Sequence, residues 1–387
     1  MSLSVLNVSK PSWSSEDVDQ LAESAQRFFE RECLPHYEQW ERQGCVDREV
    51  WRKAGAAGLL CASVPEKYGG AGGSFAHEAT ISHAAHLVGV EGFGLSLHNA
   101  IVVPYIVAFG SEEQKRAWLP RLASGDLVGA IAMTEPSGGS DLQAVKTTAR
   151  RDGNHYVLNG QKSFITNGQL ANFIIVVAKT DSSLGAKGIS LFAVETDGLD
   201  GFKRGRNLDK VGLKANDTSE LFFDAVRVPA SALIGPEEGQ GFTMLMQQLP
   251  QERLLVALGA MGRIERALIA TIDYVKQRKA FGQRLIDFQN TQFELAECKT
   301  EATVARVFID HCIGRHLEGG IDTATASMAK YWVTDLQCKI IDRCLQLHGG
   351  YGYMNEYPIA RMFRDARVER IYAGANEIMK VVIARTL

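Results

Sequence analysis

The sequence lacks the features that mark several large classes of protein. Its seven cysteines are odd in number and include no Cys-x-x-Cys pair, which argues against a disulfide framework or a zinc site. It contains no run of about 18 apolar residues, so no membrane-spanning helix is expected. Lys and Arg (42) nearly balance Asp and Glu (45), and the net charge of −3 predicts no surface for nucleic acid.

Common enzyme motifs are also missing. There is no G-x-G-x-x-G, no G-x-x-x-x-G-K-[ST] and no G-x-S-x-G, so neither a dinucleotide-binding fold, a P-loop nor a serine hydrolase elbow is indicated. The pairs His83/His86 and His311/His316 lack the glutamate of a zinc signature, and we expect no metal site. The first ten residues resemble neither a signal peptide nor an Arg-rich presequence, and we therefore expect a cytoplasmic protein.

The chain is long enough for more than one hydrophobic core. It has 387 residues, of which 45% are hydrophobic and 22% charged. Apolar residues recur at helical spacing from Ser14 to Ser124, with helices expected at 77–88 and 112–122 and with Ser14 or Ser15 as the first cap. Residues 1–124 are therefore predicted to form an N-terminal α-helical domain.

The pattern then changes to short β-type runs and later returns to long helices. The runs are 154–158, 173–179, 189–195 and 220–228. Asp152-Gly153 and Asn159-Gly160 are predicted as turns between strands. Long helical patterns follow from Gly241, including 291–317 and 323–347. We expect an α+β fold in which 125–234 form a middle antiparallel β-domain and 235–387 a C-terminal α-helical four-helix bundle.

Two segments of the middle zone have residues suited to binding an anion or a planar ring. In AIAMTEPSGGSD (130–141), small residues let backbone N–H groups approach an anion, while Thr134 and Ser140 add hydroxyls. In QKSFITNG (161–168), Phe164 and Thr166 are expected on one face of a strand. Taken singly, an ordinary turn and a half-buried strand explain these patterns equally well.

Two further segments lie in the C-terminal zone. YVKQRKAFG begins at Tyr274 and places Arg278 at a helix end, where it could hold a phosphate or simply complete the helix dipole. LQLHGGYGY and RIYAGANEIM, between residues 345 and 379, contain the glycines of closely approaching loops. Together and in this order, the four segments resemble the acyl-CoA dehydrogenase family over nearly the whole chain, and most of all its long-chain type.

The resemblance implies a non-covalent FAD between the β-domain and the C-terminal bundle. It implies that Arg278, Phe281 and Gln289 contact the FAD of a neighbouring subunit, and hence a homotetramer built as a dimer of dimers. The implied FAD-binding residues are Met133, Thr134, Ser140, Phe164, Thr166, Arg278, Phe281, Gln289, Gln346, Gly349, Gly350, Ala375 and Glu377. The implied substrate-binding residues are Ser140, Arg253 and Gly374.

The reaction implied by the resemblance is the α,β-dehydrogenation of an acyl-CoA thioester to a trans-2-enoyl-CoA, with electrons passed to electron-transfer flavoprotein. Many relatives carry their catalytic glutamate in the motif IYEG, where this sequence has Ala373. The backbone N–H of Ala373 can still polarise the thioester carbonyl. Long-chain and isovaleryl-CoA dehydrogenases place the base on the helix that here reads LPQERLL, which makes Glu252 the candidate base, ahead of Glu377.

Some alternatives remain open at this point. Pro250 could begin a helix, and Glu252 would then merely favour the helix N-terminus. Gly259 and Gly262 could leave room for a long or branched acyl chain, or could serve close helix packing. A flavin oxidase or monooxygenase of the same fold, or a non-catalytic FAD- or acyl-CoA-binding subunit, are the alternative functions.

Overall fold

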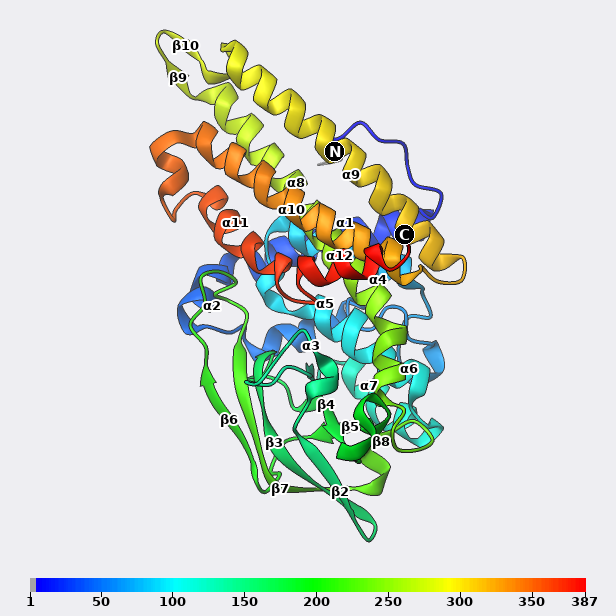
Figure 1. Cartoon of the computed structure of the whole chain (residues 1–387). Coiled ribbons are helices and arrows are strands. Elements are labelled where there is room, and N and C mark those ends of the chain that lie inside the picture. Colours follow the sequence, from blue (N-terminus) through cyan, green and yellow to red (C-terminus); the bar gives the residue numbers. More distant parts are fainter. Residues whose placement is uncertain (1–4) are drawn as a thin grey trace.

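The computed structural model describes residues 5–387 and arranges them in three parts (Figure 1). The β-sheet lies at one end, the long C-terminal helices lie at the other, and the N-terminal helices pack between and beside them. The eight strands of this sheet lie between residues 129 and 234, after the N-terminal helices and before the long C-terminal ones. We therefore propose the predicted division at residues 124 and 234.

The N-terminal part consists of helices, as predicted. Ser74 and Ser111 cap the two that the spacing predicted at 77–88 and 112–122, each with a capping box. Ser15 occupies the cap position of the first helix, but its side chain makes no capping hydrogen bond. The helices are α1 (Glu16–Phe28), α2 (Tyr37–Gln43), α3 (Arg48–Ala56), α4 (Phe75–Val88), α5 (Leu95–Leu97), α6 (Val103–Phe109) and α7 (Glu112–Ala123).

The middle part is one twisted sheet with the strand order β6-β7-β3-β2-β4-β5-β8, and β1 pairs with β4. Most neighbours are antiparallel, as expected, but β1 and β2 run parallel to β4. The strands are β1 (Gly129–Ala132), β2 (Thr148–Asp152), β3 (His155–Thr166), β4 (Phe173–Lys179), β5 (Ile189–Glu195), β6 (Phe202–Asn207), β7 (Thr218–Pro229) and β8 (Leu233–Ile234).

One of the two predicted turns is correct. Asp152-Gly153 joins β2 to β3, with Gly153 at φ 61°. Asn159-Gly160 is not a turn but lies inside β3, where the register with β7 shifts between Leu158 and Gly160. A Cβ on Gly160 would lie 2.4 Å from Thr147 Oγ1, so this glycine allows close strand approach at a β-bulge.

The C-terminal part packs around α8, which runs from the sheet to the far end of the molecule (Figure 1). There it ends at the hairpin β9–β10 (Lys279–Ala280 and Gln283–Arg284). Leu254, Leu258, Met261, Ile264 and Leu268 are buried along one side of α8, as their spacing predicted. The helices are α8 (Gly241–Gln277), α9 (Gln289–Leu317), α10 (Thr323–His348), α11 (Pro358–Ala366) and α12 (Asn376–Ala384).

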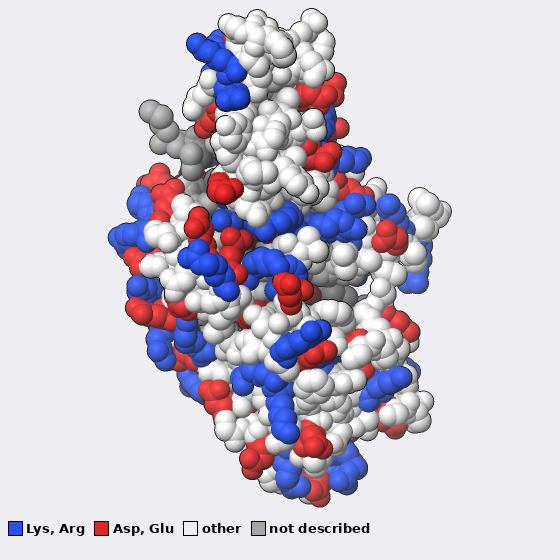
Figure 2. All heavy atoms as spheres, turned by 90° about the vertical axis from the view of Figure 1, so that its left-hand side faces the viewer, with Lys and Arg blue, Asp and Glu red and all other residues white. Residues whose placement is uncertain are grey.

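The free cysteines and the mixed surface charges of the structure agree with the reduced thiols and the balanced charge expected from the sequence. All seven cysteines are free, and five of them are buried. No helix within residues 5–387 is long and apolar enough to cross a membrane. Figure 2 shows Lys and Arg interspersed with Asp and Glu over the lower part of one face, whereas the bundle end of that face is largely uncharged.

Candidate active site

Glu252 lies well inside α8 rather than at its start. The helix begins at Gly241, so Pro250 is an internal residue and the helix-dipole explanation of Glu252 is wrong. The Glu252 side chain is buried, and the Tyr105 hydroxyl donates a hydrogen bond of 2.8 Å to its Oε1. Burial raises the pKa of Glu252 to about 7, although the Tyr105 hydrogen bond and the Arg253 charge oppose the rise. Such a carboxyl can accept a proton near neutral pH.

The position of Tyr105 depends on a local irregularity in the N-terminal part. Its helix α6 continues from α5 through a π-helical turn, η5 (His98–Val102). Within this turn, the Ala100 carbonyl accepts a 2.8 Å hydrogen bond from Gln251 Nε2. Two consecutive residues of α8, Gln251 and Glu252, are therefore hydrogen-bonded to the continuous segment formed by η5 and α6. Sequence reasoning missed Tyr105 because it sits in an apolar run, which reads as ordinary core.

Arg253 and the loop around Ala373 meet the same turn of α10. Arg253 is buried and donates to Ser327 Oγ at 3.2 Å. Three residues further on, Lys330 Nζ donates to the Gly374 carbonyl at 2.7 Å. The structure thus brings together the two segments that the sequence singled out for catalysis. A direct role of Arg253 or Gly374 in substrate binding stays a prediction.

The Ala373 loop has an unusual backbone and firm support on its C-terminal side. Ala373 has φ 52° and Gly374 has φ 88°, both in the left-handed region. Asn376, the first residue of α12, accepts from Lys330 at 2.9 Å and donates to Asp335 at 3.0 Å. Ala375 caps α12 and is partly buried, whereas Glu377 is exposed in its first turn.

A buried ion pair lies within the sheet, next to the residues predicted to bind the flavin. Lys162 Nζ contacts Glu135 Oε1 at 2.8 Å and the Val177 carbonyl at 2.7 Å. Glu135 also accepts from the Thr147 N–H and hydroxyl, at 2.9 and 2.6 Å. Burial lowers the pKa of Lys162 to about 8, and the charge of Glu135 opposes this shift. The pair anchors the Met133–Thr134 turn to β3.

Phe164 does not lie on a regular strand face, contrary to expectation. The β3–β7 register shifts between Lys162 and Ile165, and Phe164 in this bulge has φ 59° and is 68% exposed. Its ring is therefore free to pack against a planar group. Thr166 lies two residues further on, the Ser163 N–H donates to the Thr134 carbonyl at 2.9 Å, and both threonines are partly buried. Met133 is likewise partly buried, and Ser140 is exposed in the glycine-containing turn. These residues fit an FAD.

The remaining predicted FAD residues gather at the far end of the bundle. Arg278, Gln346, Gly349 and Gly350 line a single surface pocket of about 560 Å³. The Arg278 guanidinium lies 5.4 Å from the centre of the Tyr351 ring. Nearby, Phe281 in the β9–β10 hairpin is 96% exposed, and Gln289 is exposed at the start of α9. This group lies at the β9–β10 end of the bundle, whereas the strand that ends at Thr166, β3, belongs to the sheet at the other end of the molecule (Figure 1).

Gly259 and Gly262 serve close helix packing. A Cβ on Gly259 would lie 2.6 Å from His86 Nε2, and a Cβ on Gly262 would lie 2.9 Å from His86 Cβ. Both glycines therefore face α4, and the alternative that they open an acyl tunnel is wrong.

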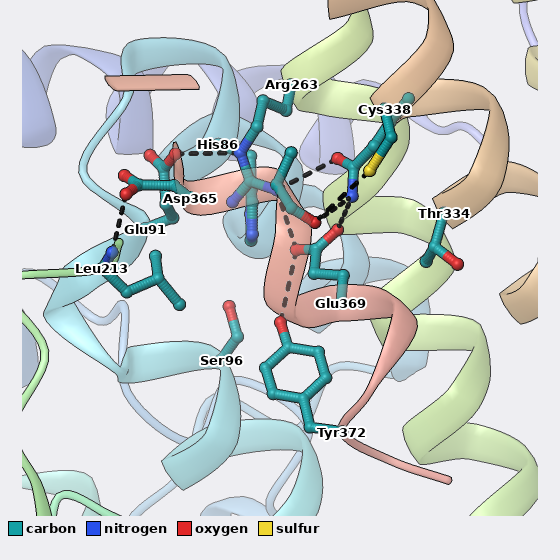
Figure 3. Close-up of polar contacts among 12 residues, drawn as sticks. His86, Glu91, Ser96, Leu213, Arg263, Thr334, Cys338, Asp365, Glu369 and Tyr372 are labelled. Atoms are coloured by element: carbon teal, nitrogen blue, oxygen red, sulfur yellow. Dashed lines mark hydrogen bonds and ion pairs between the residues drawn. The ribbon is translucent and has the colours of Figure 1, made fainter. Parts of the chain in front are cut away.

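A network of buried charges joins α8 to the segment that precedes Ala373 (Figure 3). Arg263 on α8 contacts Glu91 at 3.1 Å and Glu369 at 2.9 Å. Asp365, on α11, accepts from the Leu213 N–H at 2.6 Å. Burial and the Glu91 charge raise the pKa of Asp365 to about 6. No sequence signal marked this network, because its members are scattered along the chain.

Comparison with known proteins gives a consistent result over almost the whole chain. Three family models match, described as the N-terminal domain (residues 15–126), middle domain (130–226) and C-terminal domain (239–387) of acyl-CoA dehydrogenase. The chain is 51% identical to the mitochondrial long-chain specific acyl-CoA dehydrogenase of Sus scrofa, over 96% of this chain and 87% of the relative. It is 34% identical to the mitochondrial isovaleryl-CoA dehydrogenase of Pongo abelii, over 96% and 88%.

Solved structures agree with these relatives. An acyl-CoA dehydrogenase from Geobacillus kaustophilus superposes with a TM-score of 0.95 at 48% identity, over 97% of this chain and 99% of the other. A glutaryl-CoA dehydrogenase from Mycobacterium smegmatis in complex with FADH2 has a TM-score of 0.90 at 31% identity, over 96% and 95%.

Proposed function

Because the chain belongs to the acyl-CoA dehydrogenase family, we propose that it oxidises a long-chain acyl-CoA with Glu252 as the base that removes the α-proton. The observation that carries the proposal is the buried Glu252 carboxyl, whose pKa is raised to about 7, in a chain with Ala373 at the usual base position. The stronger identity to a long-chain relative (51%) than to an isovaleryl-CoA relative (34%) favours a long straight chain over a branched one.

In the proposed site, the sheet side binds the cofactor and the helical side carries the residues that act on the substrate. On the sheet side, Thr134, Thr166 and Phe164 would hold the flavin ring of FAD, by hydroxyl hydrogen bonds and by ring packing. When bound, FAD supplies the acceptor for the hydride that leaves the β-carbon. On the helical side, Glu252 Oε takes the α-proton while the Ala373 N–H stabilises the charge that develops on the thioester oxygen. The product is a trans-2-enoyl-CoA.

A single chain does not complete the cofactor site. Helix α8 has 37 residues and is therefore about 55 Å long, and Arg278 follows its last turn. Arg278, Phe281 and Gln289 would thus contact FAD in a neighbouring subunit, and we include a homotetramer in the proposal. Exposed apolar side chains at this end, among them Phe281, Tyr353 and Met354, fit such an interface. The mass of the FAD-loaded protein in solution tests this point, and a monomer that retains FAD would contradict it.

The proposal includes electron-transfer flavoprotein as the acceptor and a cytoplasmic location, although the two curated relatives named above are mitochondrial. Oxygen consumption compared with reduction of electron-transfer flavoprotein separates a dehydrogenase from an oxidase or monooxygenase. Anaerobic titration with acyl-CoA thioesters of increasing length, together with isovaleryl-CoA, identifies the substrate. A protein whose flavin is bleached by none of them would be a binding subunit, and the proposal would fail.

The base is tested by Glu252→Gln, with Glu318→Gln as the control. Glu252→Gln should retain FAD but lose flavin bleaching by at least about 100-fold, because an amide cannot accept the α-proton. Glu318→Gln changes an exposed carboxyl at the end of α9, outside the proposed site, and should bleach at a rate close to that of the wild type. Normal bleaching by Glu252→Gln, measured in an anaerobic stopped-flow experiment, would show that the base lies elsewhere.

A further inference from the structure

The Ala373 N–H is a backbone donor without an acceptor among residues 5–387. The loop is bonded on either side of this N–H: the Tyr372 N–H donates to the Val368 carbonyl at 3.1 Å, and the Gly374 carbonyl accepts from Lys330 at 2.7 Å. An N–H that is free and partly buried, in a loop held on both sides, is suited to bind an oxygen that gains negative charge.

The N-terminal side of this loop is held by a buried carboxylate. Glu369 lies three residues before Tyr372 and is 1% exposed. Its Oε1 accepts from the Tyr372 hydroxyl at 3.3 Å and faces Arg263 Nη1 at 2.9 Å. Its Oε2 accepts from Gln337 Nε2 at 2.5 Å. Both oxygens of Glu369 are therefore fixed, and Figure 3 shows the Tyr372 ring extending from this carboxylate toward the loop.

Charge pairing accounts for only part of the surroundings of Glu369. Glu91 faces both Arg263, at 3.1 Å, and Arg266, at 3.8 Å, so Glu369 supplies the second carboxylate for two arginines. Charge pairing does not require the hydrogen bond to Tyr372, and through this bond Glu369 also provides a fixed acceptor beside the tyrosine that precedes Ala373.

We propose that Glu369, oriented by Arg263 and Gln337, is a positioning residue that fixes Tyr372 and thereby aims the Ala373 N–H at the thioester carbonyl. The inference rests on the proposed function, because it assumes an acyl-CoA in the site. It extends that function from the residue that moves the proton to the residues that set the direction of the carbonyl donor. A donor displaced by about 1 Å loses much of its effect on a developing charge.

The test measures carbonyl polarisation directly, in the FAD-loaded full-length protein. The C=O stretching frequency of bound trans-2-hexadecenoyl-CoA is read by infrared difference spectroscopy in the wild type, Glu369→Gln and Tyr372→Phe. Glu265→Gln is the matched control, because Glu265 is also buried and paired with an arginine, Arg306 at 3.4 Å, but has no contact with the loop.

We expect the wild type and Glu265→Gln to lower the C=O frequency of the ligand equally. Glu369→Gln and Tyr372→Phe should retain FAD, lose part of that lowering, and bleach flavin about tenfold more slowly with a saturating acyl-CoA. A wild-type C=O frequency in Glu369→Gln would overturn the inference. If Glu369→Gln fails to fold, the frequency in Tyr372→Phe decides by the same criterion.

The readout separates this inference from the proposed function. Carbonyl polarisation needs no proton transfer, so it can be measured in a Glu252→Gln background. If Glu252→Gln bleaches normally, the assignment of the base fails while the frequency shift still decides the role of Glu369. If the wild type itself produces no shift with the enoyl-CoA, the Ala373 N–H does not bind the carbonyl, and the positioning role is refuted.

Discussion

The two sides of the proposed site are both supported by buried ion pairs, but in different ways. On the sheet side, Lys162 and Glu135 lie 27 residues apart, and Glu135 is bonded further by backbone N–H groups of the segment that leads into β2. On the helical side, the Arg263–Glu369 pair joins α8, α10 and the segment before Ala373, and Glu91 adds the N-terminal part. The sheet side is thus built within one domain, whereas the helical side depends on how separate parts pack together.

The largest expected effect comes from breaking the sheet-side pair. Lys162→Met should lower the free energy of unfolding by about 3–5 kcal/mol, because Glu135 would be left buried without its cation. FAD should also bind more weakly, since the Met133–Thr134 turn loses its anchor. Urea denaturation and flavin retention on dilution measure the two effects. Lys203→Met, at an exposed position of the same sheet, should stay within about 0.5 kcal/mol. An unchanged stability of Lys162→Met would mean that the backbone donors suffice for Glu135.

The next largest effect is the stability that the helical side loses by burying the Glu252 carboxyl. The pKa of Glu252 is about 7 in the folded chain, against 4.5 for an unperturbed glutamate, so the folded state holds the proton more tightly. Stability should therefore fall as pH rises from about 4.5 to about 7, and Glu252→Gln should remove this loss. Relative to the wild type, Glu252→Gln should gain about 2–3 kcal/mol more at pH 8 than at pH 5.

Urea denaturation at the two pH values checks that difference. Asp365, whose raised pKa falls in the same range, is present in both proteins and cancels. Glu318→Gln is again the control and should show no such gain. Equal differences at pH 5 and pH 8 would mean that Glu252 is not buried as an acid in solution.

The smallest effect concerns Tyr105, which joins the helical side to the N-terminal part. The Tyr105 hydroxyl stabilises the ionised form of Glu252, so Tyr105→Phe should raise the pKa of the base further. Flavin bleaching should slow roughly five-fold at pH 7 and recover at higher pH. Tyr68→Phe breaks a Tyr–Glu hydrogen bond elsewhere in the N-terminal part and should leave the pH profile unchanged. A Tyr105→Phe profile identical to that of the wild type would exclude a role for this hydroxyl.

The contrast between the two sides also explains how far the sequence could predict them. Thr134, Phe164 and Thr166 lie in two short contiguous motifs, and the family resemblance of these motifs was enough to predict a common role for them at a flavin. The helix, sheet, helix order was equally clear from the change of apolar period. The prediction failed at Asn159-Gly160, because a turn dipeptide and a β-bulge glycine look alike in sequence.

Residues whose role depends on tertiary contact could not be found in this way. Tyr105 reaches Glu252 across 147 positions from within an apolar run. Glu369 lies between Arg367 and Arg370, a pattern typical of a solvated helix end, yet it is buried. Ala373 was recognised as a missing side chain, but its positive φ and free N–H are properties of the folded backbone.

The continuous length of α8 has a consequence for the assembly. One unbroken helix carries Glu252 in its first half, and Arg278 follows its last residue. The helix therefore fixes the direction in which Glu252 points relative to Arg278, which is proposed to contact the FAD of the next subunit. Each residue turns the helix by about 100°, so one residue inserted between these points would rotate one end out of register with the other. Substitutions can accumulate along α8, but insertions and deletions within it cannot be absorbed locally. In the proposed assembly, the helix would therefore couple the position of the base in one subunit to the cofactor contacts made in its neighbour.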